Sequence, residues 1–298
     1  MDARLTPAQL EALAHVRAAS GARTDPLDAV VTINFHPDRI DAGGRSVVEG
    51  LLADGRFRSQ FETGISNGGL TAHPGGDRDR WEERMFGGAY QRPGVVPADR
   101  PKYGALDLGR HPAGAARRFG SAHLRLRPEV NARATFTLGD SFHEPAEAGV
   151  FDALSPVLAG LTDHLTAAGP LDDYVEAQVH GPVDLARDVE ALVLDDSFAG
   201  RLPAAELLTA RFDIKLEWRA GSRLAPDEVP EEFRGPEMRP LAVLLCERYS
   251  RPLLDAELIG RAARDVVTAP GEWAAWGTPA ATLQLLKYLW HILAWHGR

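Results

Sequence analysis

The sequence contains a single cysteine, Cys246, which lies in the apolar run LAVLLCERY. One cysteine excludes a disulfide within the chain and a zinc site built from several cysteines. We therefore expect Cys246 to be a small buried apolar residue and not a reactive thiol. No run of the chain approaches the roughly 18–20 uncharged apolar residues that a membrane span needs, so we expect no membrane partner.

The N-terminal segment MDARLTPAQLEALAHVRAAS lacks the basic start and the apolar run of a signal peptide. This absence leads us to expect a cytoplasmic protein. Basic residues are also outnumbered, because 33 Lys and Arg stand against 42 Asp and Glu, and the formal net charge is −9. An acidic chain is poorly suited to general nucleic-acid binding, although a local arginine patch could hold a small molecule that carries phosphate.

Several motifs that would name a chemistry directly are missing. The chain has no G-x-x-x-x-G-K-[ST] phosphate-binding loop and no G-x-G-x-x-G turn after a strand. It also has no H-E-x-x-H pair of metal-binding histidines. A candidate site must therefore be sought in the arrangement of individual polar residues.

The chain has a hydrophobic content of 44%, which is ample for a folded core. Apolar spacing, caps and breakers predict helices over 6–20, 46–55 and 152–168, and strands over 29–36, 121–127, 133–138 and 173–180. A helix and a strand follow within 204–220, and helical spacing dominates from about residue 238. We predict an α+β fold with an α/β domain over 1–237, which includes an N-terminal helix, and a helical C-terminal cap over 238–298 packed on it.

Polar and apolar residues alternate along the predicted strands 29–36, 121–127, 133–138 and 173–180, and alternate residues of a strand share one face. In DYVEAQVH over 173–180, the polar face holds Tyr174, Glu176, Gln178 and His180. In AVVTINFH over 29–36, the polar face holds Thr32, Asn34 and His36. A sheet with one solvated face produces this pattern without any function, but these side chains also suit a cleft for a polar ligand.

The segment 57–118 is rich in glycine, proline and arginine and shows little periodicity. Long loops in compact domains are usually functional or disordered, and the aromatic residues in this segment argue against disorder. Its part FETGISNGGLTAHPGGDRDRW could fold over the polar strand faces and bind a ligand through Thr63, Ser66, Asn67 and the turn at Gly68. Phosphate groups would suit Arg78, Arg80 and Arg84. Alternatively, DRDRWEERMF forms a helix with surface ion pairs.

The residue types of a metal site are present as well, in His36, Asp38, His73, Asp77 and His180. Their spacing matches no metal motif, so we assign no metal ligands. Two alternatives to the function given below stay open at this point. One is a metal-assisted hydrolase of a nucleotide-like substrate, and the other is a non-catalytic module that binds a nucleotide-like ligand or a protein.

Four segments together resemble an uncharacterised bacterial family, domain of unknown function 3626, over roughly residues 30–200: TINFHPDR, FETGISNGGLTAHPGGDRDRWEERMFGGAY, RPKYGALDL and YVEAQVHGPVDL. Their order more distantly resembles the ADP-ribosyltransferase fold, in particular its His-Tyr-Glu branch. This resemblance implies that the core is a split, mixed or antiparallel sheet. It also implies catalytic roles for His36 after the first strand, Tyr103 in KYGALDL and Glu176 in a Tyr-x-Glu setting.

The same resemblance implies that NAD is the substrate and that the nicotinamide–ribose bond is cleaved. ADP-ribose then passes to water or to an acceptor, for which a protein is one candidate. The residues implied to bind NAD are Asn34, Arg39, Thr63, Ser66, Asn67, Gly68, Arg78, Tyr174 and Gln178. In the alternative Arg-Ser-Glu branch, Arg39 takes the place of the strand arginine and the segment Thr63–Ser66 supports the NAD site.

Overall fold

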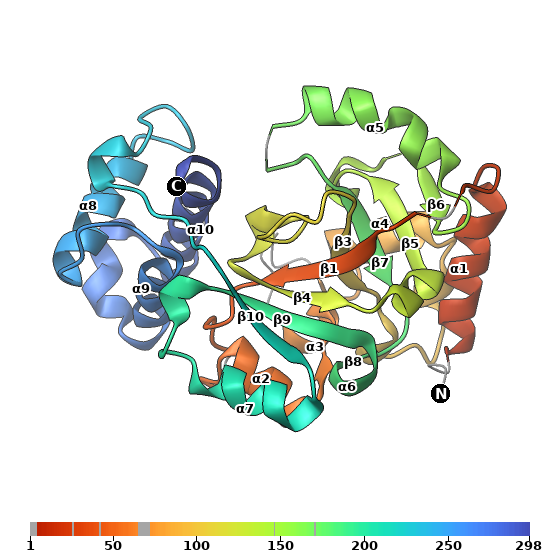
Figure 1. Cartoon of the computed structure of the whole chain (residues 1–298), viewed down its shortest axis with the longest axis horizontal. Helices are drawn as coiled ribbons and strands as arrows, with labels where there is room; N and C mark the ends of the chain where they lie inside the picture. The colour runs from red at the N-terminus through yellow and green to blue at the C-terminus, as the bar shows by residue number, and fades with distance from the viewer. Residues whose placement is uncertain (1–4, 26, 42, 65–71, 146, 170) are drawn as a thin grey trace.

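The structure is a computed structural model that describes residues 5–25, 27–41, 43–64, 72–145, 147–169 and 171–298 (Figure 1). Its strands are β1 (Val30–Phe35), β2 (Arg56–Phe57), β3 (Lys102–Asp107), β4 (Ala122–Leu126), β5 (Ala134–Leu138), β6 (Ala148–Val150), β7 (Val175–Val179), β8 (Val183–Asp184), β9 (Val189–Asp195) and β10 (Lys215–Arg219). Its α-helices are α1 (Pro7–Ala19), α2 (Val47–Asp54), α3 (Gln60–Thr63), α4 (Asp77–Met85), α5 (Ser155–Ala167), α6 (Leu185–Asp188), α7 (Pro203–Phe212), α8 (Met238–Arg248), α9 (Ala256–Thr268) and α10 (Pro279–His296).

Eight strands form one sheet in the order β10-β9-β4-β1-β3-β7-β5-β6. The pair β9–β10 is parallel and the other neighbouring strands are antiparallel, while β2 and β8 form a separate two-stranded sheet. The α+β class with a mainly antiparallel, mixed sheet is therefore confirmed. The long helices and strands predicted from spacing are also present, each with ends that differ from the prediction by a few residues.

Local sequence explains where the predicted helices begin and end. Thr6 and Gln9 form a reciprocal capping box at the start of α1, where Pro7 occupies the first helical position. Ser46 and Glu49 form the same arrangement at the start of α2. That helix ends at Gly55, whose φ of 67° is in the left-handed region that glycine adopts readily.

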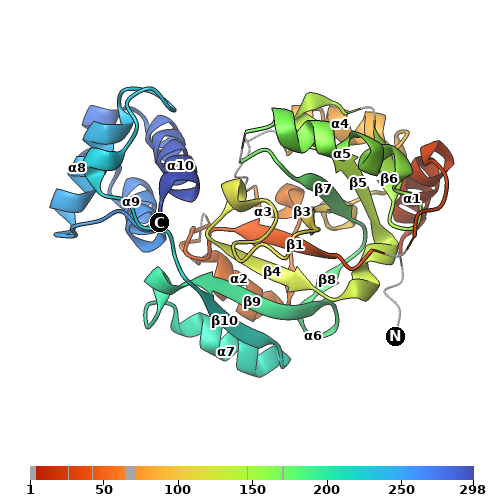
Figure 2. The ribbon, with the colours of Figure 1, turned by 45° about the horizontal axis from the view of Figure 1, so that its top comes forward.

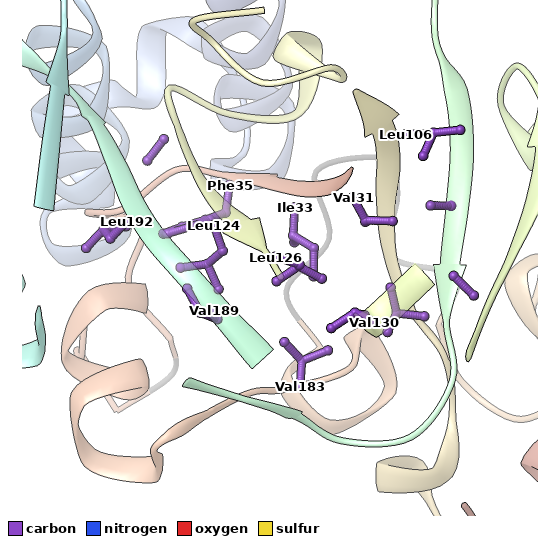
Figure 3. Close-up of a cluster of buried hydrophobic side chains, with 14 of the residues drawn as sticks. Val31, Ile33, Phe35, Leu106, Leu124, Leu126, Val130, Val183, Val189 and Leu192 are labelled. Atoms are coloured by element: carbon purple, nitrogen blue, oxygen red, sulfur yellow. The ribbon is translucent and has the colours of Figure 1, made fainter. Parts of the chain in front are cut away.

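The apolar faces of the central strands build the main hydrophobic core, as the period-two pattern predicts. Figure 3 shows Val31, Ile33 and Phe35 of β1 beside Leu124 and Leu126 of β4 in this core. Helices α2 and α7 contribute to it through Val48, Leu51, Ala205 and Leu208. This packing fixes one face of the sheet and leaves the opposite, polar face to the rest of the chain.

A second hydrophobic core joins α8, α9 and α10 at one end of the sheet, where these helices form a separate lobe in Figures 1 and 2. It also includes Phe198, Leu224 and Val229 from the chain before α8. The helices of the predicted cap thus share one core with the chain before α8, while the division into two domains at 237/238 stays a prediction. Within the described residues, no helix has the length and apolar character needed to cross a membrane.

The polar side of the sheet opens between β1 and β3. The two strands pair through Val30, Val31 and Thr32 only, although β1 continues to Phe35. Beyond Thr32, β1 remains paired with β4, and β3 remains paired with β7. Gly104 lies next to the last paired residue of β3, where the two backbones are still close. A Cβ at Gly104 would lie 2.4 Å from the carbonyl oxygen of Thr32.

The cap and the sheet meet closely at Gly260 of α9. A Cβ at this position would lie 1.7 Å from Oδ2 of Asp38, which follows β1. We expect Gly260→Ala to lower stability, because overpacking costs about 1–3 kcal/mol and exceeds the gain in helix propensity of about 1 kcal/mol. Chemical denaturation measures the change in the free energy of unfolding.

The matched control is Gly50→Ala in α2, where a Cβ would meet no atom within 4 Å. This substitution should raise the free energy of unfolding by about 1 kcal/mol through helix propensity alone. If both alanine variants are stabilised to the same extent, α9 does not pack against Asp38 as described.

Candidate functional site

A cleft with a volume of about 660 Å³ lies where β1 and β3 diverge. This volume is within the range of roughly 300–1,000 Å³ that small-molecule sites occupy. Seven of the residues predicted from sequence line it: Asn34, His36, Arg39, Thr63, Arg78, Tyr103 and Glu176. The three residues with predicted catalytic roles therefore face one cavity, although they come from three segments far apart in the chain.

The polar strand face is covered by protein and not by solvent. All residues of β1 and β7 are buried on both faces. Helix α4 and the 3₁₀ turn η1 (Ala89–Gln91) supply much of the cover, since Glu82 and Tyr90 bond to side chains of that face. The described part of this loop-rich segment that forms α4 and η1 therefore folds over the polar face, as one of the two interpretations of the sequence proposed.

Glu176 lies on β7 opposite Ala105 of β3 and Thr137 of β5. One of its carboxylate oxygens accepts a hydrogen bond from Nε2 of Gln178 at 2.9 Å. Burial, together with the nearby charge of Asp140, raises the pKa of Glu176 to about 7, although Arg78 and hydrogen bonds from Gln178 and Ser141 act in the opposite direction. A carboxyl group that titrates near neutral pH inside a cleft is a strong candidate for a functional group.

A buried chain of hydrogen bonds extends from Glu176 along the sheet. Gln178 Oε1 accepts from the hydroxyl of Thr135 at 2.8 Å, and that hydroxyl lies 3.1 Å from Nε2 of His180. Because the Thr135 proton goes to Gln178, His180 Nε2 must donate and His180 Nδ1 accepts from the Tyr90 hydroxyl. Burial lowers the pKa of His180 to about 3, which agrees with this neutral imidazole.

These hydrogen bonds correct the prediction that Gln178 binds the ligand. The amide group is fully buried and does not line the cleft, so it is not placed to bind a ligand directly. Its two hydrogen-bonding ends are occupied by Thr135 on one side and by Glu176 and Thr137 on the other. Gln178 therefore positions the carboxylate of Glu176.

Tyr103 on β3 is held by a buried cluster of charged side chains. Its hydroxyl donates to Oε1 of Glu82 at 2.9 Å, and the guanidinium carbon of Arg78 lies 4.3 Å from the centre of its ring. Arg100 pairs with Glu82 at 2.8 Å and with Asp79 at 2.6 Å. Burial raises the pKa of Glu82, while Arg100 opposes that shift. These contacts hold the side chain of Tyr103 in place at the wall of the cleft.

His36 and Asn34 extend the polar face of β1 but have different surroundings. The ring of His36 contacts Trp290 of α10 edge to face, with ring centres 5.1 Å apart. Burial lowers the pKa of His36, with Arg39 adding to the effect, so the imidazole is neutral. The amide of Asn34 donates to the carbonyl of Ala113 at 2.7 Å, so Asn34 holds a wall of the cleft.

Several other predicted ligand-binding residues are placed elsewhere. Tyr174 is buried against Phe119, with ring centres 5.8 Å apart, and does not line the cleft. Arg80 and Arg84 are exposed and pair with Asp77 and Glu144. The alternative interpretation predicted a helix with surface ion pairs, and helix α4 does place these two arginines outward, whereas Arg78 on the same helix is buried. The predicted residues Ser66, Asn67 and Gly68 lie outside the described residues.

The five residues considered for a metal site do not converge. His73 is exposed and bonds to the carbonyl of Pro74, while His180 is engaged with Tyr90 and Thr135. Across the described parts of the chain, no three side chains of His, Cys, Asp or Glu come together in a way that could hold a metal ion.

Sequence reasoning missed several residues that line the cleft or support its walls. Glu82 was hidden in a segment that reads as a charged surface helix, although Arg78 and Glu82 are four residues apart and so share one helix face. Asp140 and Ser141 follow β5, in a turn that carries no motif. Arg118 and Arg234 line the cleft from distant segments, and no local pattern connects them.

The fold and the cleft define an α+β protein with a buried glutamate in a cavity between two diverging strands. A family model described as "Protein of unknown function (DUF3626)" matches residues 30–168 and 162–296, so the chain belongs to this family. The "Gene 2 protein" of Mycobacterium phage L5 is 28% identical over 191 residues, which cover 56% of this chain and 67% of that protein. The "Gene 2 protein" of Mycobacterium phage D29 is 45% identical over 92 residues, which cover 30% of this chain and 31% of that protein.

Proposed function

We propose that this protein cleaves the nicotinamide–ribose bond of NAD and transfers ADP-ribose to an acceptor or to water. The observation that carries the proposal is the common cleft of His36, Tyr103 and Glu176. These are the residues to which the resemblance to the His-Tyr-Glu branch of ADP-ribosyltransferases assigns catalytic roles. The opening of the sheet between β1 and β3 is also in keeping with the split sheet of that fold.

The side chains suit the chemistry of this reaction. When the bond between the nicotinamide nitrogen and C1′ of the ribose breaks, its electron pair leaves with nicotinamide and positive charge develops on the ribose, as in glycoside cleavage. The ionised carboxylate of Glu176 would stabilise this charge, and preorganised electrostatic groups of this kind usually make the largest contribution to catalysis. A nucleophile, water or an acceptor group, then bonds to C1′ and loses its proton.

Other residues of the cleft would bind and orient the substrate. Tyr103 offers an aromatic ring for the nicotinamide, and since Arg78 covers one of its faces, the ligand would use the other. The neutral His36 can hydrogen-bond to ribose hydroxyls. Arg39 and Arg78 offer positive charge for the phosphates of NAD, and Thr63 lines the same cleft.

The direct test is incubation of the full chain with NAD, followed by measurement of NAD affinity by calorimetry and of free nicotinamide by chromatography. We expect saturable binding and the release of nicotinamide. Binding without release would favour a non-catalytic module, and an absence of both at millimolar NAD would overturn the proposal.

The pH dependence of the reaction provides a second prediction. Because catalysis needs ionised Glu176 and its pKa is raised to about 7, kcat/KM should increase as the pH rises through about 7 and then level off. Gln178→Met removes a hydrogen bond that lowers this pKa, so its midpoint should move to higher pH. Rates of nicotinamide release between pH 5.5 and pH 9 give both midpoints. An unchanged midpoint in the variant would contradict the role assigned to Gln178.

A further inference from the structure

Four basic side chains meet where the sheet and the helical cap join, and we call Arg39, Arg118, Arg234 and Lys287 the basic junction. Arg39 follows β1, Arg118 lies in the 3₁₀ turn η3 (Arg117–Phe119), Arg234 precedes α8, and Lys287 is on α10. The three arginines line the cleft. Arg118, Arg234 and Arg39 all act on the charge of Lys287 and, after burial, lower its pKa.

The basic junction is poorly neutralised by the protein. Among the described residues, Arg118 pairs with Asp172, whereas Arg39, Arg234 and Lys287 take part in no ion pair. The carboxylates Asp38 and Asp140 act on Arg39 and Lys287 from outside ion-pair distance. Basic groups crowded together inside a protein disfavour one another's charge, so an anion bound among them would relieve that repulsion.

Unused hydrogen-bonding groups are found in the same place. The Nε atoms of Arg118 and Arg234 are buried and have no hydrogen-bond partner in the described structure. The same is true of both ring nitrogens of His291, whose side chain is 1% exposed. Burial lowers the pKa of His291 to about 3, with Arg234 and Arg118 adding to the effect, so this imidazole is neutral and can donate one hydrogen bond. Buried groups of this kind normally have partners.

The backbone at Arg234 is a further unusual feature. Its φ of 70° is in the left-handed region, which non-glycine residues seldom adopt. The guanidinium carbon lies 5.5 Å from the centre of the Tyr288 ring on α10, so the side chain is held against the cap beside the cleft. A strained residue at a cavity wall is often a functional one.

Helix α10 presents Lys287 on the same face as Trp290 and His291, because these residues lie three and four positions after it. Trp290 fixes that face to the sheet side of the cleft. Its Nε1 donates to the carbonyl oxygens of Arg117 and Arg118 at 3.2 and 3.1 Å, and its ring contacts His36. Cap and sheet are thus joined next to Arg118.

We propose that the basic junction binds a phosphate or pyrophosphate group, with Arg234 before α8 and Lys287 on α10 supplying charges that the sheet alone lacks. Three arginine forks and an ammonium group suit the geometry and charge of such an anion. The group could belong to the diphosphate of the dinucleotide or to a phosphorylated acceptor. The inference rests on the proposed function only for this choice of source.

The test is calorimetric titration of the full chain with inorganic pyrophosphate. We expect Arg234→Asn and Lys287→Gln each to weaken binding at least about 10-fold, the typical loss for a hydrogen bond to a charged group. Asparagine tolerates the left-handed backbone, so Arg234→Asn should keep the melting temperature. Lys215→Gln is the matched control, because Lys215 is exposed and pairs with Glu190 far from the cleft. Unchanged affinity in both junction variants, or no pyrophosphate binding to the wild type at millimolar concentration, would overturn the inference.

Competition identifies the source of the phosphate group. If NAD displaces pyrophosphate, the group is the diphosphate of the dinucleotide, and if both bind together, a second phosphorylated molecule supplies it. Pyrophosphate binding that depends on Arg234 in a protein without nicotinamide release would uphold this inference and reject the proposed function. Nicotinamide release, together with pyrophosphate binding that the variants do not alter, would uphold the proposed function and reject this inference.

Discussion

Glu176→Gln should lower the rate of nicotinamide release at least about 100-fold, as the loss of one preorganised electrostatic group commonly does. The amide keeps the size of the side chain and can still accept the hydrogen bond from Gln178. It cannot supply the negative charge that balances the developing charge on the ribose. NAD should therefore still bind, and the effect should be on kcat more than on KM.

The control variant is Glu190→Gln on β9, which removes a carboxylate that pairs with Arg125 and Lys215 away from the cleft. Its rate of nicotinamide release should match that of the wild type. If Glu176→Gln keeps more than about a tenth of the wild-type rate, a loss far smaller than such a group should cause, Glu176 is not the catalytic carboxylate.

The same substitution, which lowers the reaction rate, should raise the stability of the protein above pH 7. The pKa of Glu176 is raised from 4.5 to about 7 in the folded chain, so folding favours the protonated form. The wild type therefore loses stability as the pH rises from about 4.5 to about 7, by an amount on the order of 3 kcal/mol. Glu176→Gln removes this loss, and its melting temperature should exceed that of the wild type above pH 7 but not at pH 4.

The largest loss of stability should come from Arg100→Met. This substitution leaves Glu82 and Asp79 without their buried partner, and breaking such a pair costs roughly 3–5 kcal/mol. The melting temperature should fall by roughly 5–10 °C. Because Glu82 also holds the hydroxyl of Tyr103, the affinity for NAD should fall as well.

Arg17→Met is the control for that experiment, since Arg17 and Asp152 form an exposed pair. Exposed ion pairs contribute at most about 1 kcal/mol, so the melting temperature should change little. Equal losses in the two variants would mean that Glu82 of α4 is not buried against Arg100.

The alternation of side chains predicted the central strands well, because one face of each must pack on the core. It could not show whether the other face meets water or protein, since the same residues suit either environment. Glu176 and Gln178 were therefore both placed on a ligand-facing surface, whereas the structure places Glu176 in the cleft and Gln178 behind it. The spacing of residues along one strand does not show which other segment of the protein packs over it.

Strand β3 shows a second limit. Its sequence KYGALD contains a glycine and only short apolar stretches, so it resembles the loop around it, and only the family resemblance drew attention to Tyr103. Pairing with β1 on one side and β7 on the other makes it a strand. Tertiary contacts commonly override local propensity in this way.

The basic junction shows a third limit. Arg39, Arg118, Arg234 and Lys287 are spread over most of the chain and share no motif. They come together because Trp290 and Gly260 bring α10 and α9 against the end of β1. Contacts between distant segments of this kind follow from packing and cannot be read from spacing.

The most direct test of the central claim is a crystal structure of the Glu176→Gln variant soaked with NAD, which should bind the substrate without cleaving it. We expect nicotinamide against the ring of Tyr103, ribose C1′ beside the side chain of residue 176, and the diphosphate beside Arg39 in the same cleft. NAD bound outside this cleft, or a cleft that stays empty at millimolar NAD, would contradict it.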